Sequence, residues 1–374
     1  AKLSIWLVTL AKGRPFGFLD HNLRSGDSLL GIHRLDQLTQ LSMNPTGQCQ
    51  LRLFGQHIEH AVREAIELRQ RLREIPIRDI CDVEAMAHLD ADARHKLEMP
   101  GSIADAFTGE LIATGGNASA IESAVTILAI QAGKAVAGEH YALDSIVNRA
   151  REALSVDLPP SKPVRKPLHW PLEFPEVFTQ DSSGFDAIIG NPPFLGGKKI
   201  STSLGEGYRK AIVTSTAHNR KGAADLCAYF LLRAHQLLNR PLGAAGLIST
   251  DSICDGDNAT IGLRGLASDS AQLISAVKSM PWPGKAGVSI AILCWVTAET
   301  NWRGNYALDG RDVERIQWDF TLGDGSVREI RTLKSKIVES FAGTNIHGEG
   351  FLLPPNEARM LIANNAKNSL VVKP

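Results

Sequence analysis

Residues 185–194 are Phe185-Asp186-Ala187-Ile188-Ile189-Gly190-Asn191-Pro192-Pro193-Phe194. The first six form a short apolar run, which predicts a buried β-strand. The strand should end at Asn191-Pro192, because proline has no N–H with which to continue a ladder. In open α/β sheets, ligands bind beyond the carboxyl ends of the strands. We therefore expect a functional site at Asn191–Phe194.

Helical and strand patterns alternate after this strand. A helix is expected over residues 225–238, where apolar residues recur at helical spacing, and it ends near Pro241 and Gly243. Further strands are expected at 245–250, 272–279, 288–297 and 315–320. Buried strands that alternate with helices predict an α/β fold for this part of the chain.

The part of the chain before residue 158 shows mainly helical patterns. Residues 55–75 place Ile58, Val62 and Ile66 on one face and charged residues on the other, and residues 118–153 are rich in Ala and Ile. A proline-rich stretch at 158–178 predicts an extended linker. The expected divisions are a partial core at 1–50, a helical insertion at 51–157, a catalytic core at 158–300 and a C-terminal extension at 301–374.

The composition is that of an ordinary globular protein, with 44% hydrophobic and 21% charged residues. Lys plus Arg equals Asp plus Glu at 40 each, so any contact with nucleic acid must come from a local basic patch. No run approaches the roughly 20 apolar residues that span a bilayer. The cysteines have neither CxxC nor metal-ligand spacing, so we expect reduced thiols, no metal site and a cytoplasmic protein. They are Cys49, Cys81, Cys227, Cys254 and Cys294.

The residue types at 191–194 suit chemistry on an exocyclic amine, whose lone pair is delocalised into its ring. The amide oxygen of Asn191 and a backbone carbonyl fixed by proline can accept the two amine hydrogens, which frees the lone pair for attack. Pro192 and Pro193 restrict φ and hold that carbonyl, and Phe194 offers a face on which a base can stack. The alternative is a simple strand-to-turn break, because Asn-Pro and Pro-Pro are common in loops.

Several further motifs accompany Asn191–Phe194 in order along the chain. They are Ala1–Leu7, Phe18–Gly31, His169–Phe178, Gly184–Asp186, Asp225–Phe230, Gly246–Thr250 and Pro281–Gly284. Together they resemble the large adenine-specific DNA methyltransferases of type II restriction–modification enzymes, relatives of which occur in phage-defence islands. The resemblance extends from residue 1 to about residue 360 and is weakest in the helical insertion.

The resemblance implies the Rossmann-like sheet of S-adenosylmethionine-dependent methyltransferases, incomplete at its N-terminus. It implies methyl transfer to N6 of an adenine flipped out of double-stranded DNA, with other restriction or defence subunits as further partners. Asn191 and Pro192 would hold the adenine amine, and Phe194 would stack on the base. Asp27 would accept from the amino group of the cofactor's adenine, with Ser28 beside it. The alternative for Asp27 is an ordinary turn aspartate.

In one respect the sequence departs from this family. A glycine-rich turn that cradles the methionine part of the cofactor, followed by an acidic residue, should precede Ala1. The triplet Gly115-Gly116-Asn117 cannot replace that turn, because it follows no clear strand. We expect a fragment of a longer protein that lacks this turn and a separate target-recognition domain. Residues 1–374 alone should then bind the cofactor weakly or not at all, which calorimetric titration would test.

Basic residues follow the motif closely at Lys198, Lys199, Arg220 and Lys221. Around the mouth of a pocket they could neutralise phosphates that flank a flipped base. The alternative is a solvated loop, and Gly196-Gly197 indicates that such a loop would be mobile. For Trp282 we expect either a place in the base pocket or a place in the core.

Two other functional classes remain open at this point. The same motif serves methyl transfer to protein glutamine or to some RNA adenines, because those acceptors are also planar nitrogens. From a different class, a chain without the glycine-rich turn could be a non-catalytic DNA-binding or scaffold part of a defence complex. Replacement of Asn191 by Ala separates the classes, because a scaffold would keep its biological activity.

Overall fold

The computed structural model describes residues 2–8, 19–45, 53–178, 184–240, 242–300, 302–323, 354–365, 368 and 372. The chain divides into two units, residues 1–327 and residues 328–374. In the second unit the structure describes helix α14 (Pro355–Asn364). All of the elements discussed below belong to the first unit.

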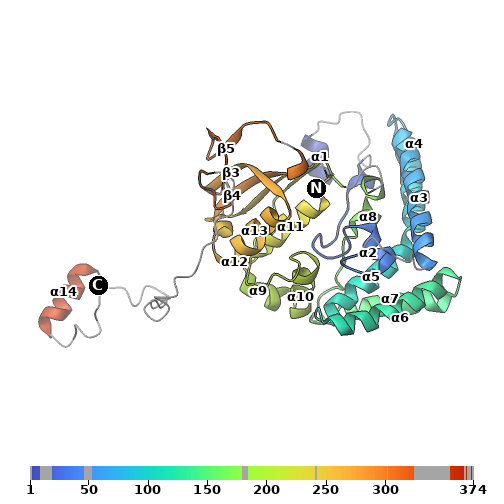
Figure 1. The fold of residues 1–374 in the computed structure, drawn as a ribbon, viewed down its shortest axis with the longest axis horizontal. Helices are drawn as coiled ribbons and strands as arrows, with labels where there is room; N and C mark the ends of the chain where they lie inside the picture. The colour runs from blue at the N-terminus through green and yellow to red at the C-terminus, as the bar shows by residue number, and fades with distance from the viewer. Residues whose placement is uncertain are drawn as a thin grey trace. The chain divides into compact units, whose positions relative to one another are not determined.

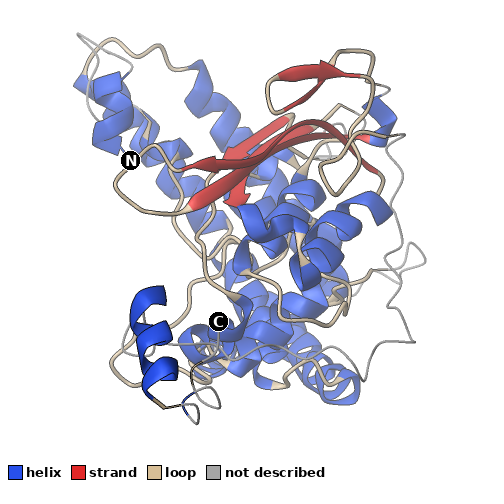
Figure 2. Cartoon of the chain, turned by 90° about the vertical axis from the view of Figure 1, so that its left-hand side faces the viewer, coloured by secondary structure: helices blue, strands red, loops and turns tan. Residues whose placement is uncertain are grey.

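A mixed β-sheet forms one half of this unit (Figure 2). Its strands lie in the order β1-β2-β4-β3-β5-β6. Strand β1 pairs with β2 in parallel, whereas β4 runs antiparallel to both β2 and β3. The bounds are Ala187–Gly190 for β1, Ala244–Thr250 for β2, Ala271–Pro281 for β3, Ser289–Thr297 for β4, Tyr306–Leu308 for β5 and Arg311–Val313 for β6.

The core of this half lies between the sheet and helix α11 (Leu226–Leu237). Leu247 of β2, Trp295 of β4 and Tyr229 of α11 are all buried in it. Side chains of β2 alternate between buried and half-buried positions, as expected for a strand whose two faces differ. Shorter helices complete this half (Figure 1). They are α9 (Gly197–Leu204), α10 (Glu206–Ser215), α12 (Gly256–Asn258) and α13 (Arg264–Ser268).

A block of five helices forms the other half of the unit (Figure 1). Phe54, Ile58, Phe107, Leu128 and Ile146 belong to its buried core. The helices are α3 (Leu53–Glu74), α4 (Ile80–Lys96), α5 (Glu98–Ala113), α6 (Ala118–Val136) and α7 (His140–Leu154). Earlier in the chain lie α1 (Lys2–Val8), η1 (Asp20–Asn22) and α2 (Leu35–Gln40).

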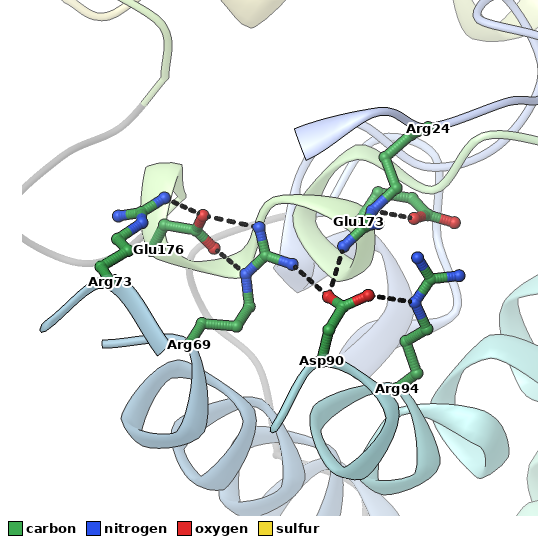
Figure 3. Close-up of polar contacts among 7 residues, drawn as sticks. All are labelled: Arg24, Arg69, Arg73, Asp90, Arg94, Glu173 and Glu176. Carbon is green, nitrogen blue, oxygen red and sulfur yellow. Dashed lines mark hydrogen bonds and ion pairs between the residues drawn. The ribbon is translucent and has the colours of Figure 1, made fainter. Parts of the chain in front are cut away.

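A network of ion pairs joins helices α3 and α4 to two segments of the other half (Figure 3). Asp90 of α4 lies 3.0 Å from the Arg24 guanidinium, 3.4 Å from that of Arg69 and 2.8 Å from that of Arg94. Arg69 of α3 also makes a two-pronged contact with Glu176, at 2.9 Å to each carboxylate oxygen. The remaining contacts are Arg24 with Glu173 and Arg73 with Glu176.

The observed elements confirm the α/β class and most of the expected segments. Strand β1 forms where it was expected, but it lies at the edge of the sheet with Ile189 90% exposed, so the prediction that this strand is buried was wrong. Residues 118–153 form two helices rather than one, because the chain turns at Gly138, whose φ is +93°. The expected linker at 158–178 also contains helix α8 (Trp170–Glu173) and the short helix η2 (Pro175–Val177). The prediction of a strand at 315–320 was wrong. Within the described residues, the backbone of this segment makes a single bridge between Ile316 and Leu322, and the strands that follow β4 there are β5 and β6.

Candidate active site

A cavity of about 800 Å³ opens where β1 ends. Asn191, Pro192, Pro193 and Phe194, which follow the strand, form part of its wall. Gly26, Asp27 and Ser28, from the opposite end of the sequence, form another part. Ligand pockets typically enclose about 300–1,000 Å³. The fold therefore gathers both of the predicted residue groups around one ligand-sized space.

The loop after β1, residues 191–194, presents its polar side chain to solvent. Asn191 is exposed, whereas Pro192 is buried and anchors the chain. Within the described residues, the Asn191 amide has no hydrogen-bond partner in the protein. Phe194 is 37% exposed on the cavity wall. An unpaired amide and an exposed ring face are therefore both available to a ligand.

Asp225, just before α11, fixes the chain directly behind this loop. Its Oδ1 accepts a hydrogen bond from the Gly197 N–H at 3.0 Å, and the next residue, Leu226, donates to the Leu195 carbonyl at 2.8 Å. The Asn258 side chain holds Asp225 in turn, through its Oδ1 at 2.6 Å from the Asp225 N–H. Sequence reasoning missed Asp225 and Asn258. The position of Asp225 before a helix was the available signal.

Gly197 has a reason to be glycine other than mobility. A Cβ atom at this position would lie 2.0 Å from the Ala223 carbonyl oxygen. Gly197 therefore permits a close approach of two backbone segments, and at this residue the structure shows a packed junction.

The segment Asp27–Ile32 is held by backbone pairing with residues 166–170. The Asp27 N–H donates to the Lys166 carbonyl at 2.8 Å, and the Leu168 N–H donates to the Asp27 carbonyl at 3.1 Å. The Trp170 indole N–H donates to the Ser28 carbonyl at 3.2 Å. The proline-rich stretch thus forms the support for one wall of the cavity.

The two oxygens of the Asp27 carboxylate differ in their hydrogen-bond partners. Its Oδ1 accepts from the N–H groups of Leu29 and Leu30 at 3.0 and 3.3 Å. The Tyr208 hydroxyl also donates to Oδ1, at 3.3 Å. Oδ2 has no hydrogen-bond partner among the residues that the structure describes. Asp27 is therefore a turn aspartate, as the alternative interpretation held, and it also lines the cavity.

A buried cation, Arg233 of α11, lies behind Asp27. Its guanidinium donates to the Leu29 carbonyl and the Thr216 hydroxyl, each at 3.0 Å, and contacts the His33 imidazole. Burial lowers the pKa of Arg233 to about 10, so the side chain stays charged at neutral pH. Burial, and after it the Arg233 charge, hold the pKa of His33 well below its ordinary value, so His33 is a neutral acceptor.

The remaining cavity wall is largely apolar. Trp170, Phe194 and Phe230 contribute aromatic surface, and leucines fill the space between them. The Trp170 ring is fixed by an edge-to-face contact with Phe185 at 5.7 Å between centroids. Flat aromatic walls beside a carboxylate oxygen suit a planar base that carries an amine. Trp282 is half-buried in the β3–β4 connection and is not among the residues that line this cavity.

The four basic residues of the sequence analysis differ in their surroundings. Lys198 and Lys199 are exposed on α9, and Lys221 is exposed in the connection between α10 and α11. Arg220 is half-buried, and its guanidinium lies 3.7 Å from the Asp269 carboxylate. Their role in DNA binding stays a prediction.

In the described part of the chain, no group of three or more His, Cys, Asp or Glu side chains could hold a metal ion. None of the described helices has the length and apolar character needed to cross a membrane.

No curated protein matches the chain. Among solved structures, the chain is similar to the type IIL restriction–modification enzyme MmeI, solved in complex with DNA, with 19% identity and a TM-score of 0.38. That likeness covers 61% of this chain and 33% of MmeI, so the chain spans about a third of the length of that enzyme. Residues 138–278, which include β1, Asn191–Phe194 and α11, match the family model described as the Eco57I restriction-modification methylase.

Proposed function

We propose that this protein transfers a methyl group from S-adenosylmethionine to N6 of adenine in double-stranded DNA, as part of restriction–modification or phage defence. One observation carries the proposal. Asp27 and the Asn191–Phe194 loop, which lie far apart in the sequence, line the same cavity. An aspartate that binds the cofactor and a loop that activates the acceptor amine must lie close together, because the methyl group passes directly between the two molecules.

The residues present fit the nucleoside end of the cofactor. Asp27 Oδ2, which has no partner in the described part of the protein, can accept from the amino group of the cofactor's adenine. Ser28 lies beside it on the cavity wall. The apolar side chains of Trp170 and Phe230 provide surface against which a purine packs. When bound, this cofactor supplies an electrophilic methyl group on a sulfonium.

The chain's own residues act on the acceptor. The Asn191 amide oxygen and the Pro192 carbonyl accept the two hydrogens of the target amine, which returns the nitrogen lone pair from the ring to the attacking direction. The buried Pro192 keeps that carbonyl in place. Phe194 stacks on the base after it leaves the duplex. Methyl transfer by direct displacement then depends on proximity and alignment more than on a strong base.

We assign the acceptor to nucleic acid because exposed lysines follow the Asn191–Phe194 loop, and to DNA because residues 138–278 match a restriction-modification methylase model. Lys198 and Lys199 follow the catalytic loop on α9, and both are free to approach phosphates. The chain as a whole carries no net charge, so we expect DNA binding to depend on this local patch and to weaken with added salt.

The test compares Asn191→Ala with Asn148→Ala in the protein expressed from its complete reading frame. Asn148 is an exposed asparagine on α7. Transfer of radiolabelled methyl groups to plasmid DNA, to RNA and to protein is measured, and the modified base is identified by mass spectrometry. We expect N6-methyladenine in DNA from the wild type and from Asn148→Ala, and a loss of about 100-fold or more in Asn191→Ala.

Three outcomes would overturn the proposal. Retained DNA methylation by Asn191→Ala would remove the loop from the chemistry. Label in RNA or in protein glutamine instead of DNA would reassign the acceptor. Absence of transfer by the wild type, with biological activity unchanged in Asn191→Ala, would favour a scaffold.

A further inference from the structure

Hydrogen bonds to Oδ1 fix the orientation of the Asp27 carboxylate. Oδ1 accepts three hydrogen bonds, two from the backbone of its own turn and one from the Tyr208 hydroxyl. A carboxylate oxygen has room for little more than this. Oδ2 is consequently the oxygen that remains for a ligand in the cavity.

Tyr208 is rigidly placed at the start of α10. The preceding residue, Gly207, donates its N–H to the Asp157 carboxylate at 2.8 Å, and a Cβ atom there would lie 2.6 Å from the Ile112 carbonyl oxygen. The Arg165 guanidinium packs over the Tyr208 ring at 6.0 Å from its centroid. These contacts hold the Tyr208 side chain in the position from which its hydroxyl donates to Asp27.

The Tyr208 hydroxyl is a permanent donor. The side chain is 2% exposed and lines the cavity. Burial, together with the negative charge of Asp27, raises the pKa of Tyr208 far above its ordinary value. The proton therefore stays on the hydroxyl at every pH at which the protein would be assayed.

A second buried tyrosine shows that this contact is not a general requirement of the core. Tyr229 on α11 is 0% exposed, and its hydroxyl has no hydrogen-bond partner within the described residues. Removal of the Tyr229 hydroxyl is therefore a matched control, because it changes a buried Tyr to Phe without touching Asp27.

We propose that Tyr208 is a positioning residue for the cofactor, because its hydroxyl occupies Asp27 Oδ1 and leaves Oδ2 directed to the amino group of the cofactor's adenine. Arg233 supports the same turn through the Leu29 carbonyl. Tyr208 lies on α10, which α9 separates from the Asn191–Phe194 loop. This inference rests on the proposed use of S-adenosylmethionine.

The experiment measures binding rather than catalysis. Titration calorimetry gives the Kd of S-adenosylhomocysteine and of S-inosylhomocysteine, in which a carbonyl oxygen replaces the adenine amine. The proteins are the wild type, Tyr208→Phe, Tyr229→Phe and Asp27→Asn, each expressed from the complete reading frame, with thermal unfolding as the measure of folding.

We expect the wild type and Tyr229→Phe to prefer the adenine compound, because a carboxylate oxygen accepts from an amine and repels a carbonyl. Tyr208→Phe should bind S-adenosylhomocysteine about tenfold more weakly, with a much smaller change for the inosine compound. Asp27→Asn should lose the preference. The ratio of the two Kd values separates positioning from a general loss of structure, which would weaken both ligands equally.

The outcomes distinguish the two proposals. A wild-type protein that does not discriminate between the compounds would overturn the role of Asp27 and with it the proposed cofactor site. A wild type that discriminates, beside a Tyr208→Phe variant with an unchanged ratio, would overturn the inference about Tyr208 alone. Equal weakening of both ligands in Tyr208→Phe would likewise reduce Tyr208 to a packing role.

Discussion

At the residue scale, the absence of a Cβ atom at Gly197 allows the chain after the Asn191–Phe194 loop to pack against residues 223 and 224. The backbone carbonyls of Ala223 and Ala224 lie where a side chain would begin, at 2.0 and 2.6 Å from an added Cβ. Neither neighbour is a flexible side-chain end, so the backbone itself would have to shift. The loop from Asn191 to Phe194 would move with it, because Gly197 is tied to Asp225.

Gly197→Ala should therefore destabilise the protein by about 2 kcal/mol or more and lower methyl transfer. Gly133→Ala is the control, because Gly133 lies inside helix α6 with nothing within 4 Å of its added Cβ. It should be neutral or stabilise the protein by up to about 1 kcal/mol. Chemical denaturation measures both variants. A Gly197→Ala protein as stable and as active as the wild type would contradict the packed junction.

At the scale of elements, helices α3 and α4 brace the supports of the cavity. Arg24 lies three positions before Asp27, and Glu173 ends the short helix α8 that begins with the cavity residue Trp170. Asp90 holds Arg24, and Arg69 holds Glu176 (Figure 3). Most of these charges are shielded from water, with side-chain exposures of 5% for Arg24 and Arg69 and 11% for Asp90. Loss of Asp90 would leave Arg24 with Glu173 and Arg69 with Glu176, and would remove the shielded hydrogen bonds that both arginines donate to Asp90.

Asp90→Asn should destabilise the folded protein by about 2 kcal/mol, because three arginines lose the carboxylate that they share. Cofactor affinity should also fall, since Arg24 precedes the Asp27 turn. Asp82→Asn on the same helix removes an exposed pair with Arg78 and should change neither quantity appreciably. Thermal unfolding and calorimetric titration test both variants. Equal behaviour of the two would show that the network does not brace the cavity.

At the scale of the whole molecule, several histidines make the fold sensitive to acid. Burial is the first cause that lowers the pKa of each of His21, His33 and His235. For His33 the charges of Arg233, Arg34 and His218 act in the same direction. The folded protein keeps these rings neutral at a pH where the unfolded chain already binds protons. Stability should therefore fall as the pH drops below about 6.5 and level off below the folded pKa values.

His33→Asn isolates the largest of these contributions. Asparagine can still accept from Arg233, but it cannot be protonated. The melting temperature of the wild type should drop more between pH 8 and pH 5.5 than that of His33→Asn, while His21 and His235 contribute equally to both proteins. Parallel pH profiles for the two proteins would rule out His33 as the sensitive group.

Local pattern was sufficient for most of the elements and for the position of residues 191–194 at the end of a strand. The strand before Asn191, helix α11 and the pair β3 and β4 follow from apolar periodicity and from proline at their ends, and these signals act over a few residues. The prediction of a strand at 315–320 was wrong because local pattern does not determine whether a strand finds a partner. Residues 316–320 alternate between apolar and polar side chains, and the apolar ones are buried although the backbone does not pair along its length.

Contacts between distant segments required the folded chain. Nothing near Asp27 in the sequence indicates that Tyr208 occupies one of its oxygens, or that Arg233 supports its turn, because hydrogen bonds of this kind depend on how helices pack and not on spacing. The same holds for Gly197, because no local pattern indicates that the Ala223 backbone lies against it. Residue types and their periodicity thus set the chemistry and the elements, whereas the placement of each polar atom in the cavity depends on long-range packing that no local pattern encodes.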